Sequence, residues 1–320
     1  MILILSTPTD LDTQNVIEWL SNYNASFFRL NDEDLLKGNV ELYYDLLDES
    51  KTHFRQEEKE IYLKDISIVW FRKFGFLKTY ESEFNKRSDI TRYLYTEFSV
   101  MRSLIFNLLS KKKWLYRKEN MPSKLDVLKT AYLCGLNVPN TKILSNKKLL
   151  NEFFDANNKE LLTKSLGEGK HVDYDNENYP FFTRKIESTS SITKKFSPTL
   201  FQNYIDKIIE LRIFYLDGDC YSMAIFSQNN PETKIDFRSY DLEKPTRYVP
   251  YELPKDIKLK INNMMNKLKL NTGSIDMIYS IDNKYYFLEV NPAGQFGMTS
   301  SPCNYNLHEK VAQYLLKNSN

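Results

Sequence analysis

The chain contains few of the residues that build disulfide frameworks, zinc sites or histidine-centred catalytic sites. Its 320 residues include 3 cysteines and 3 histidines. Cys134, Cys220 and Cys303 are odd in number and far apart, which excludes a disulfide framework and a zinc pattern and predicts a reduced, cytoplasmic protein. The histidines show no ligand or triad spacing, and no serine or cysteine lies in a nucleophile motif such as G-x-S-x-G.

Long apolar runs and an excess of one charge are also missing. No run reaches the roughly 20 apolar residues of a membrane-spanning helix, and the apolar start Met1–Leu5 lacks the basic flank of a signal peptide. The 44 Lys and Arg against 42 Asp and Glu give a net charge of +2, which argues against a general nucleic-acid binder. With 42% hydrophobic and 14% aromatic residues, the chain can bury a large core. We therefore expect a globular protein that binds neither nucleic acid nor a membrane.

The first third of the chain alternates strand and helix patterns, which is typical of a small open α/β sheet. Continuous apolar segments predict strands at 2–5, 27–30 and 66–71. Asp12 or Thr13 is suited to cap a first helix. Apolar residues at spacings of four and three predict a long helix over 94–108.

The rest of the chain combines strands and helices in another order. A boundary falls near 119–122, and a capped helix and short strands follow it. From residue 200 onward the pattern is mostly β, with a final hairpin and a C-terminal helix at 309–316. We expect a chain of α/β and α+β class in three segments, 1–118, 119–200 and 201–320.

The most informative chemical signal is a pair of carboxylates in the final hairpin. Two apolar-rich runs flank Asp282–Asn283, a dipeptide suited to a two-residue turn. That turn would place Asp276 opposite Glu289 with their Cβ atoms about 5 Å apart, and Asn291 on the same face. Like charges so placed destabilise a sheet unless a cation offsets them, and these oxygen ligands suit Mg²⁺ that also binds nucleotide phosphates. The alternative is two acids at a solvated sheet edge, and a one-residue slip in register would separate the pair.

A second candidate site is a lysine followed by a loop that contains glycine. Lys164 ends an apolar strand at 161–164, and Gly167 and Gly169 follow it. A lysine at a strand end can direct a compact charge at a phosphate, and backbone N–H groups of a glycine loop can approach phosphate oxygens. The segment is not a Walker A loop, so a surface lysine and an ordinary turn glycine are equally good interpretations.

A third pattern, an acid and an arginine two residues apart, occurs twice. Glu210 and Arg212 form one pair, and Asp236 and Arg238 form the other. Residues so spaced lie on one face of a strand, where a guanidinium can hold a phosphate or a carboxylate in a bidentate manner. The alternative for both is a surface ion pair worth well under about 1 kcal/mol. Just before the first pair, Gln202–Ile205 could offer backbone groups to a base.

In this order, the features resemble the ATP-grasp fold. The likeness covers about 120–300 by motif, and the α/β segment before it looks like the preceding domain of that superfamily. The closer resemblance is to the ATP-grasp ligases that modify ribosomally made peptides, the microviridin and graspetide maturases with their grasp-with-spasm branch. The segments that carry it are 1–6, 67–72, 124–141, 207–212 and 287–295. The last two, Lys207-Ile-Ile-Glu-Leu-Arg212 and Phe287-Leu-Glu-Val-Asn-Pro-Ala-Gly-Gln295, are the specific ones.

The resemblance implies roles for the candidate residues. The residues that would bind the nucleotide, with the adenine hinge at Gln202–Ile205 and the γ-phosphate near Arg212, are Lys124, Lys164, Gly167, Gly169, Gln202, Asn203, Tyr204, Ile205 and Arg212. The Mg²⁺ ligands would be Asp276, Glu289 and Asn291, and the residues at the reacting groups would be Glu210, Arg212, Asp236 and Arg238. Lys164 is followed by Ser165 where the family more often has proline, and no role extends to Arg184 or Lys185.

The implied activity is an ATP- and Mg²⁺-dependent ligation within a precursor peptide that has a leader and an acidic core rich in Thr and Ser. ATP phosphorylates an Asp or Glu side chain of the peptide. A Thr or Ser hydroxyl, or a Lys amine, then attacks the acyl phosphate, which gives an ω-ester or ω-amide macrocycle, ADP and phosphate. A homodimer is a further option for such an enzyme.

Two alternatives remain open at this point. One is an ATP-grasp ligase of the glutathione-synthetase or glutamate-adding type, whose acceptor is a free amino acid. The segment Trp70-Phe71-Arg72 and the layout of the whole chain favour the peptide maturase over it. The other is a non-catalytic module that binds nucleotide or peptide, which would have no need of Asp276, Glu289 and Asn291.

Overall fold

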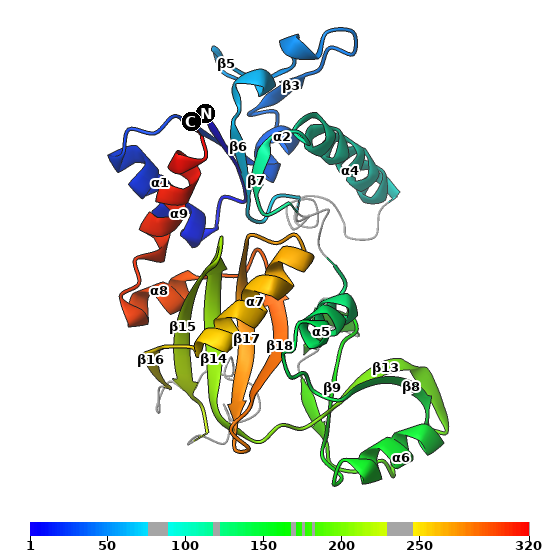
Figure 1. The fold of residues 1–320 in the computed structure, drawn as a ribbon. Coiled ribbons are helices and arrows are strands. Elements are labelled where there is room, and N and C mark those ends of the chain that lie inside the picture. The colour runs from blue at the N-terminus through cyan, green and yellow to red at the C-terminus, as the bar shows by residue number, and fades with distance from the viewer. Residues whose placement is uncertain are drawn as a thin grey trace. The chain divides into compact units, whose positions relative to one another are not determined.

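The computed structural model describes residues 1–75, 89–117, 122–167, 171–174, 177–180, 183–228 and 246–319. Gly169, Asp236 and Arg238, named above as candidate site residues, lie outside this part of the chain. The chain divides into two compact units, one of Met1–Glu119 with Pro292–Asn320 and one of Asn120–Asn291, which Figure 1 shows as a ribbon. Both ends of the chain therefore belong to the first unit, and the division into three segments stays a prediction.

A four-stranded parallel sheet lies at the centre of the first unit. Its order is β2 (Phe27–Asn31), β1 (Ile2–Ser6), β6 (Ile68–Phe71) and β7 (Lys113–Leu115), and all three pairings are parallel. Every residue of β1 and β6 is buried, as is usual for parallel strands covered on both faces. The α/β sheet predicted for the first third is confirmed.

Helices from both ends of the chain complete this unit. They are α1 (Leu11–Asn22), α4 (Asp89–Leu108), α8 (Gly297–Cys303) and α9 (Leu307–Lys317). The spacing of the buried residues of α9 puts them on one helical face; they are Leu307, Val311, Ala312 and Leu315. α9 lies beside α1 (Figure 1), so the last helix of the chain packs on the first.

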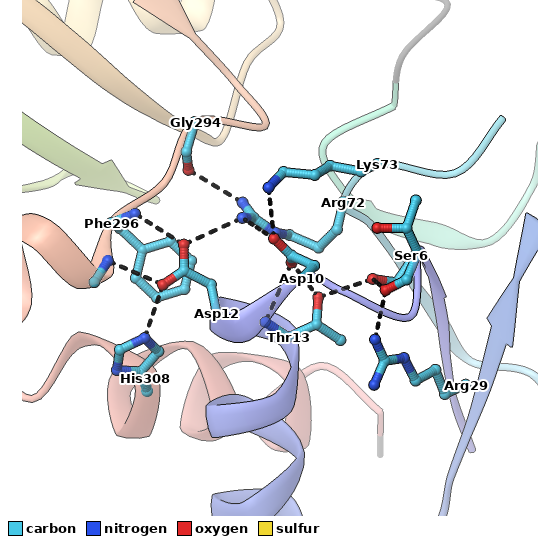
Figure 2. A network of polar contacts seen from close by, with 12 residues as sticks. Ser6, Asp10, Asp12, Thr13, Arg29, Arg72, Lys73, Gly294, Phe296 and His308 are labelled. Carbon is cyan, nitrogen blue, oxygen red and sulfur yellow. Dashed lines mark hydrogen bonds and ion pairs between the residues drawn. The ribbon is translucent and has the colours of Figure 1, made fainter. Parts of the chain in front are cut away.

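The first helix begins earlier than predicted. Its N-cap is Asp10, not Asp12 or Thr13, and the Asp10 side chain accepts a hydrogen bond from the Thr13 N–H. Thr13 is the third helical residue, which is the usual donor to an N-cap side chain. Asp12 instead lies within the first turn, and its carboxylate does not cap the helix. Because Asp12 is only 6% exposed, this carboxylate makes its contacts with other parts of the unit (Figure 2).

A small antiparallel sheet in this unit has no clear sequence signal. Its order is β3 (Glu41–Tyr43), β4 (His53–Gln56) and β5 (Lys59–Tyr62). Short helices, α2 (Asp32–Leu36) and the 3₁₀ turns at Glu49–Lys51 and Leu63–Asp65, flank it. Strands of three or four residues are too short to show a period, which is why the pattern does not reveal them.

The second unit contains a four-stranded sheet over a small apolar core. The sheet order is β12 (Arg184–Ile186), β9 (Leu161–Lys164), β13 (Lys195–Asn203) and β8 (Thr141–Asn146). Helix α6 (Lys147–Ala156) contributes Leu150, Phe153 and Phe154 to a core shared with Leu161 and Phe201. A separate hairpin consists of β10 (His171–Tyr174) and β11 (Glu177–Pro180).

A five-stranded antiparallel sheet forms the rest of the second unit. Its order is β16 (Arg247–Tyr251), β15 (Asp219–Phe226), β14 (Lys207–Leu216), β17 (Thr272–Ser280) and β18 (Tyr285–Asn291). Helix α5 (Lys124–Leu133) contacts β18 and α7 (Lys255–Lys267). β14 is the middle strand, so its side chains have strand neighbours on both sides. None of the helices that the structure describes is long and apolar enough to span a membrane.

Candidate active site

The final hairpin brings together the two carboxylates predicted from the sequence. Asp276 on β17 is the register partner of Glu289 on β18, and Ser274 is the partner of Asn291. Asn291 lies two residues beyond Glu289 and therefore shares its face of the sheet. The predicted opposition of Asp276 and Glu289 is confirmed.

The turn of this hairpin is not the predicted two-residue turn. The Ser280 N–H donates to the Lys284 carbonyl, which leaves a loop of Ile281, Asp282 and Asn283. Asn283 has a φ of 59°, a left-handed conformation that asparagine tolerates and that three-residue hairpin loops require. The longer loop shifts the register by one residue near the turn, and a bulge between Asp276 and Met277 restores the pairing of Asp276 with Glu289.

A cation from the neighbouring strand faces this pair. Arg212 on β14 is the register partner of Asp276, and its Nη1 donates to Asp276 Oδ1 at 2.7 Å and Oδ2 at 2.8 Å. The strands β14, β17 and β18 thus place Arg212, Asp276 and Glu289 in one line across the sheet. Arg212 therefore offsets part of the repulsion between the two carboxylates. From the sequence alone, a metal ion was the only cation expected to do so.

The donor atoms of Asp276, Glu289 and Asn291 fit a hard divalent cation, because all of them can be oxygens. In the part of the chain that the structure describes, no group of three or more His, Cys, Asp or Glu could hold a metal. A metal here would therefore depend on two carboxylates and one amide oxygen, with phosphate and water in its other positions. Asp276 and Glu289 are half-buried and Asn291 is exposed, which leaves this face accessible to a ligand.

Glu210 pairs with a lysine to which the sequence analysis gave no role. Lys207 Nζ donates to Glu210 Oε1 at 2.7 Å, and Ser227 Oγ donates to the same atom at 2.6 Å. In a regular strand, residues three apart lie on opposite faces, but a register shift between Lys207 and Ile209 turns both side chains inward. Burial raises the pKa of Glu210, and although Lys207 and Ser227 lower it, the pKa stays above its usual value. The alternative of a surface ion pair between Glu210 and Arg212 is therefore wrong, since Glu210 belongs to a buried pair.

The predicted adenine hinge lies at the end of β13 and is held by side-chain hydrogen bonds. Gln202 Nε2 donates to Thr141 Oγ1 at 2.9 Å, and the Asn140 N–H donates to Asn203 Oδ1 at 2.7 Å. Tyr204 and Ile205 follow and are half-buried. These contacts tie the first two hinge residues to the start of β8 and to the residue before it.

The residues predicted to contact phosphates lie on elements other than β13, which carries the start of the hinge. Lys164 at the end of β9 is half-buried and pairs in register with Leu200, whereas Asn203 pairs with Leu161 at the other end of β9. Gly167 is exposed, and Lys124 is the first residue of α5. The structure thus places Lys164 and the hinge on adjacent strands of one sheet.

Lys185, to which the resemblance extends no role, lies beside the predicted hinge. It lies on β12 with its Nζ 4.6 Å from the centre of the Tyr204 ring, and it donates to Glu160 Oε1 at 2.6 Å. Its pKa is raised, chiefly by that hydrogen bond. Nothing in the sequence links Lys185 to Tyr204, because the pairing of β12 with β9 that brings them together is not readable from local spacing.

Comparisons with known proteins agree with this architecture. A family model described as the MvdD pre-ATP grasp domain matches residues 1–121. No curated protein matches the chain. Among solved structures, a RiPP-associated ATP-grasp ligase of Chryseobacterium gregarium, in complex with ADP and a leader and core peptide, is 25% identical with a TM-score of 0.83, over 99% of this chain and 96% of that one.

Two further structures have the same fold at lower identity. The macrocyclase MdnC of Microcystis aeruginosa MRC, bound with the precursor peptide MdnA, is 22% identical with a TM-score of 0.81, over 99% of this chain and 100% of that one. The ATP-grasp ligase PsnB, complexed with a variant of a minimal precursor, Mg and ADP, is 15% identical with a TM-score of 0.82, over 100% of this chain and 98% of that one. The chain therefore has the fold of an ATP-grasp ligase behind a pre-ATP-grasp domain, and its resemblance to the ATP-grasp maturases of ribosomal peptides is confirmed.

Proposed function

We propose that this chain is an ATP-dependent ligase that closes macrocycles in a ribosomally made precursor peptide. The observation that carries the proposal is the line of Arg212, Asp276 and Glu289 across three adjacent strands. It occurs in a chain that matches, over 99% of its length, a ligase solved with ADP and a leader and core peptide.

The proposed reaction has two steps. A carboxylate of an Asp or Glu side chain of the peptide attacks the γ-phosphorus of ATP, so that ADP leaves and an acyl phosphate forms. A Thr or Ser hydroxyl, or a Lys amine, of the same peptide attacks the acyl carbon and expels phosphate, which gives an ω-ester or ω-amide. The protein's contribution is to position the groups, neutralise phosphate charge and exclude water from the acyl phosphate.

The candidate magnesium ligands are Asp276, Glu289 and Asn291. Magnesium bound there with ATP would supply neutralisation of the phosphate charge. The contact of Arg212 with both oxygens of Asp276 holds its guanidinium at this carboxylate. Such a fixed guanidinium can stabilise a transferring phosphoryl group without reorganising during the reaction.

Glu210 is the acid beside this arginine on β14. Its bonds to Lys207 and Ser227 suit it to hold the strand next to Arg212 in place. The acceptor side of the site is proposed for Asp236 and Arg238, with Arg238 holding a peptide carboxylate.

As the resemblance implies, the nucleotide is proposed to be held between the central and C-terminal ATP-grasp segments, that is, between the four-stranded and the five-stranded sheet of the second unit. Lys124 and Lys164 would contact phosphates, together with Gly167 and Gly169. The hinge Gln202–Ile205 would offer backbone groups to adenine, a role supported by the hydrogen bonds that fix Gln202 and Asn203.

The partner that this chemistry requires is a precursor peptide with a leader and an acidic core rich in Thr and Ser. We further propose a cytoplasmic location, since Cys134, Cys220 and Cys303 are free thiols, and a homodimer as the assembly. The free-amino-acid ligase and the non-catalytic module have no observation in their favour over the macrocyclase.

The test uses the purified chain with ATP, Mg²⁺ and a short peptide, rich in Thr, Ser, Asp and Glu, encoded beside its gene. Mass spectrometry should show an ATP-dependent loss of one water per ring, matched by one ADP released. The matched control is the same peptide with Asn and Gln in place of Asp and Glu, which should stay unmodified. An intact acidic peptide, with ligation of a free amino acid instead, would support the glutathione-synthetase type.

A further inference from the structure

The four-stranded sheet of the second unit has two chemically different faces. Helix α6 covers one of them, and the strand residues in the core beneath it include Leu161, Phe201 and the partly buried Ile186. Because side chains alternate between the two faces of a strand, Leu162 and Gln202 lie on the other face. Lys185 pairs in register with Leu162, which in turn pairs with Gln202. Residues paired in this way share a face, so Lys185 lies on the same face as the first residue of the predicted hinge.

Lys185, Glu160 and Tyr204 form a closed set of contacts on this face. Glu160 directly precedes β9 and Tyr204 directly follows β13, and the Tyr204 N–H donates to the Glu160 carbonyl at 2.9 Å. Lys185 Nζ donates to Glu160 Oε1 at 2.6 Å and lies 4.6 Å from the centre of the Tyr204 ring. Glu160 therefore holds the backbone of Tyr204 directly and its ring through Lys185.

These contacts extend the support of the hinge to its third residue. Gln202 and Asn203 are tied to the start of β8 and to the residue before it. The Tyr204 carbonyl accepts a hydrogen bond from Asn203 Nδ2 at 3.3 Å, which is long for such a bond, so the shorter contacts with Glu160 hold this residue more firmly. The Tyr204 carbonyl and the Ile205 N–H belong to one planar peptide group. Fixing Tyr204 therefore also limits the direction of the Ile205 N–H.

The contribution of this ion pair to stability does not explain it. The side chain of Lys185 is 32% exposed and that of Glu160 is 41% exposed, and ion pairs so exposed add little to the stability of a fold. The hydrogen bond to Glu160 raises the pKa of Lys185, so the ammonium stays charged beside the Tyr204 ring, where a cation is attracted to the ring electrons. What the contacts determine is a local geometry, and that geometry belongs to the hinge.

We propose that Lys185 and Glu160 are positioning residues for the nucleobase: they hold Tyr204, and with it the Ile205 N–H, so that the hinge discriminates adenine from other purines. The inference rests on the adenine hinge in the proposed function. It assigns a role to a lysine that the resemblance leaves without one.

Two variants of the full chain change the charge in opposite directions and weaken the same contact. Lys185→Ala removes a positive charge, whereas Glu160→Gln removes a negative charge and keeps the carbonyl that binds the Tyr204 N–H. If Lys185 only attracted the phosphates, the first change would weaken nucleotide binding and the second would strengthen it. A positioning role requires both changes to weaken it. Lys142→Ala is the matched control, because Lys142 Nζ lies 4.8 Å from the centre of the Phe153 ring on the α6 face of the same sheet.

The measurement is the binding of ADP and of IDP, each with Mg²⁺, by titration calorimetry. IDP differs from ADP only at one edge of the base, where a donor and an acceptor exchange places, so the ratio of the two affinities reports on the hinge. We expect each single variant to bind ADP about fivefold more weakly, an effect worth about 1 kcal/mol, and to bind IDP as the wild type does. Lys185→Ala/Glu160→Gln should bind ADP no more weakly than either single variant, because both changes act on one contact. Lys142→Ala should match the wild type for both nucleotides.

The outcomes separate the two levels of the proposal. The wild type should prefer ADP to IDP, and equal affinities would overturn the hinge assignment and the positioning role with it. If the wild type prefers ADP and both single variants keep that preference, the hinge assignment stands and the positioning role is wrong. Opposite shifts for Lys185→Ala and Glu160→Gln would show attraction by charge alone and overturn the positioning role. An equal loss of affinity for ADP and IDP, which a general loss of structure produces, would overturn it as well.

Discussion

Replacing Lys207 with methionine would leave Glu210 as an isolated charge in the middle of a sheet. The two side chains are only 4% and 10% exposed, and after the change Glu210 would keep, among the residues that the structure describes, only the hydrogen bond from Ser227. Removing one partner of a buried pair costs about 3–5 kcal/mol. In a unit of this size, 1 kcal/mol shifts Tm by about 2–4 °C, so we expect Lys207→Met to lower the Tm of the second unit by roughly 6–20 °C.

The loss should depend on pH in a direction that the structure fixes. The pKa of Glu210 is already raised by burial and is lowered only in part by Lys207, so removing Lys207 raises it further. A group whose pKa is higher in the folded state than in the unfolded state stabilises the fold at low pH, and the contribution is lost as pH rises through the folded pKa. The Tm deficit of Lys207→Met should therefore be smaller at about pH 5 than at about pH 8.

The assay is thermal unfolding of the full chain by calorimetry at both pH values. Lys207→Met/Glu210→Gln should recover part of the loss, because no buried charge remains. Lys267→Met, at an exposed lysine of α7 in the same unit, should change Tm little. Equal losses for Lys207→Met and Lys267→Met at both pH values would refute the reasoning.

The remaining predictions concern the proposed reaction. Glu289→Gln should abolish Mg²⁺-dependent turnover with the circular dichroism spectrum unchanged; wild-type turnover at ordinary Mg²⁺ would rule out Glu289 as a ligand. Lys164→Ala should weaken ATP binding by about 1–3 kcal/mol, the loss of a charged hydrogen bond, and an unchanged Kd in calorimetry would make it a surface lysine. Arg212→Ala should stop phosphoryl transfer while the peptide still binds, whereas Arg238→Ala should lose peptide modification while ATP still binds. Full macrocyclisation by both arginine variants would contradict these two roles.

The local sequence pattern predicts the strands and helices that contain the candidate site. It does not predict the exact register in which those strands pair. Asp276 and Glu289 pair as predicted, although the predicted turn is wrong, because a bulge compensates for the extra loop residue. No residue near the bulge signals it, since a bulge depends on the pairing of two strands and not on one segment. The predicted pairing is therefore correct because two features that the prediction lacks, the third loop residue and the bulge, shift the register in opposite directions.

Two other contacts could not be predicted from the sequence, each for its own reason. Lys207 and Glu210 are three apart, a spacing that a regular strand places on opposite faces, and only the register shift beside Ile208 brings them together. Arg72 Nη1 donates to the carbonyl of Gly294, 222 residues away, and no periodicity spans that distance. The sequence contains both motifs, but the contact between them exists only in the folded chain.

The packing of α9 on α1 also sets an order on biosynthesis. The matched pre-ATP-grasp segment ends at residue 121, yet Asp12 finds its partners at Phe296, Gly297 and His308. At ordinary translation rates the ribosome adds these residues on the order of ten or more seconds after the segment that contains Asp12 has been made. During that interval Asp12 has Arg72 as a partner but lacks Phe296, Gly297 and His308, and the side of α1 that α9 contacts is uncovered. The first unit is therefore the part of the chain that is made first and finished last. A chain truncated before α8 should therefore be most exposed to proteases in its first 121 residues, although none of those residues has been removed.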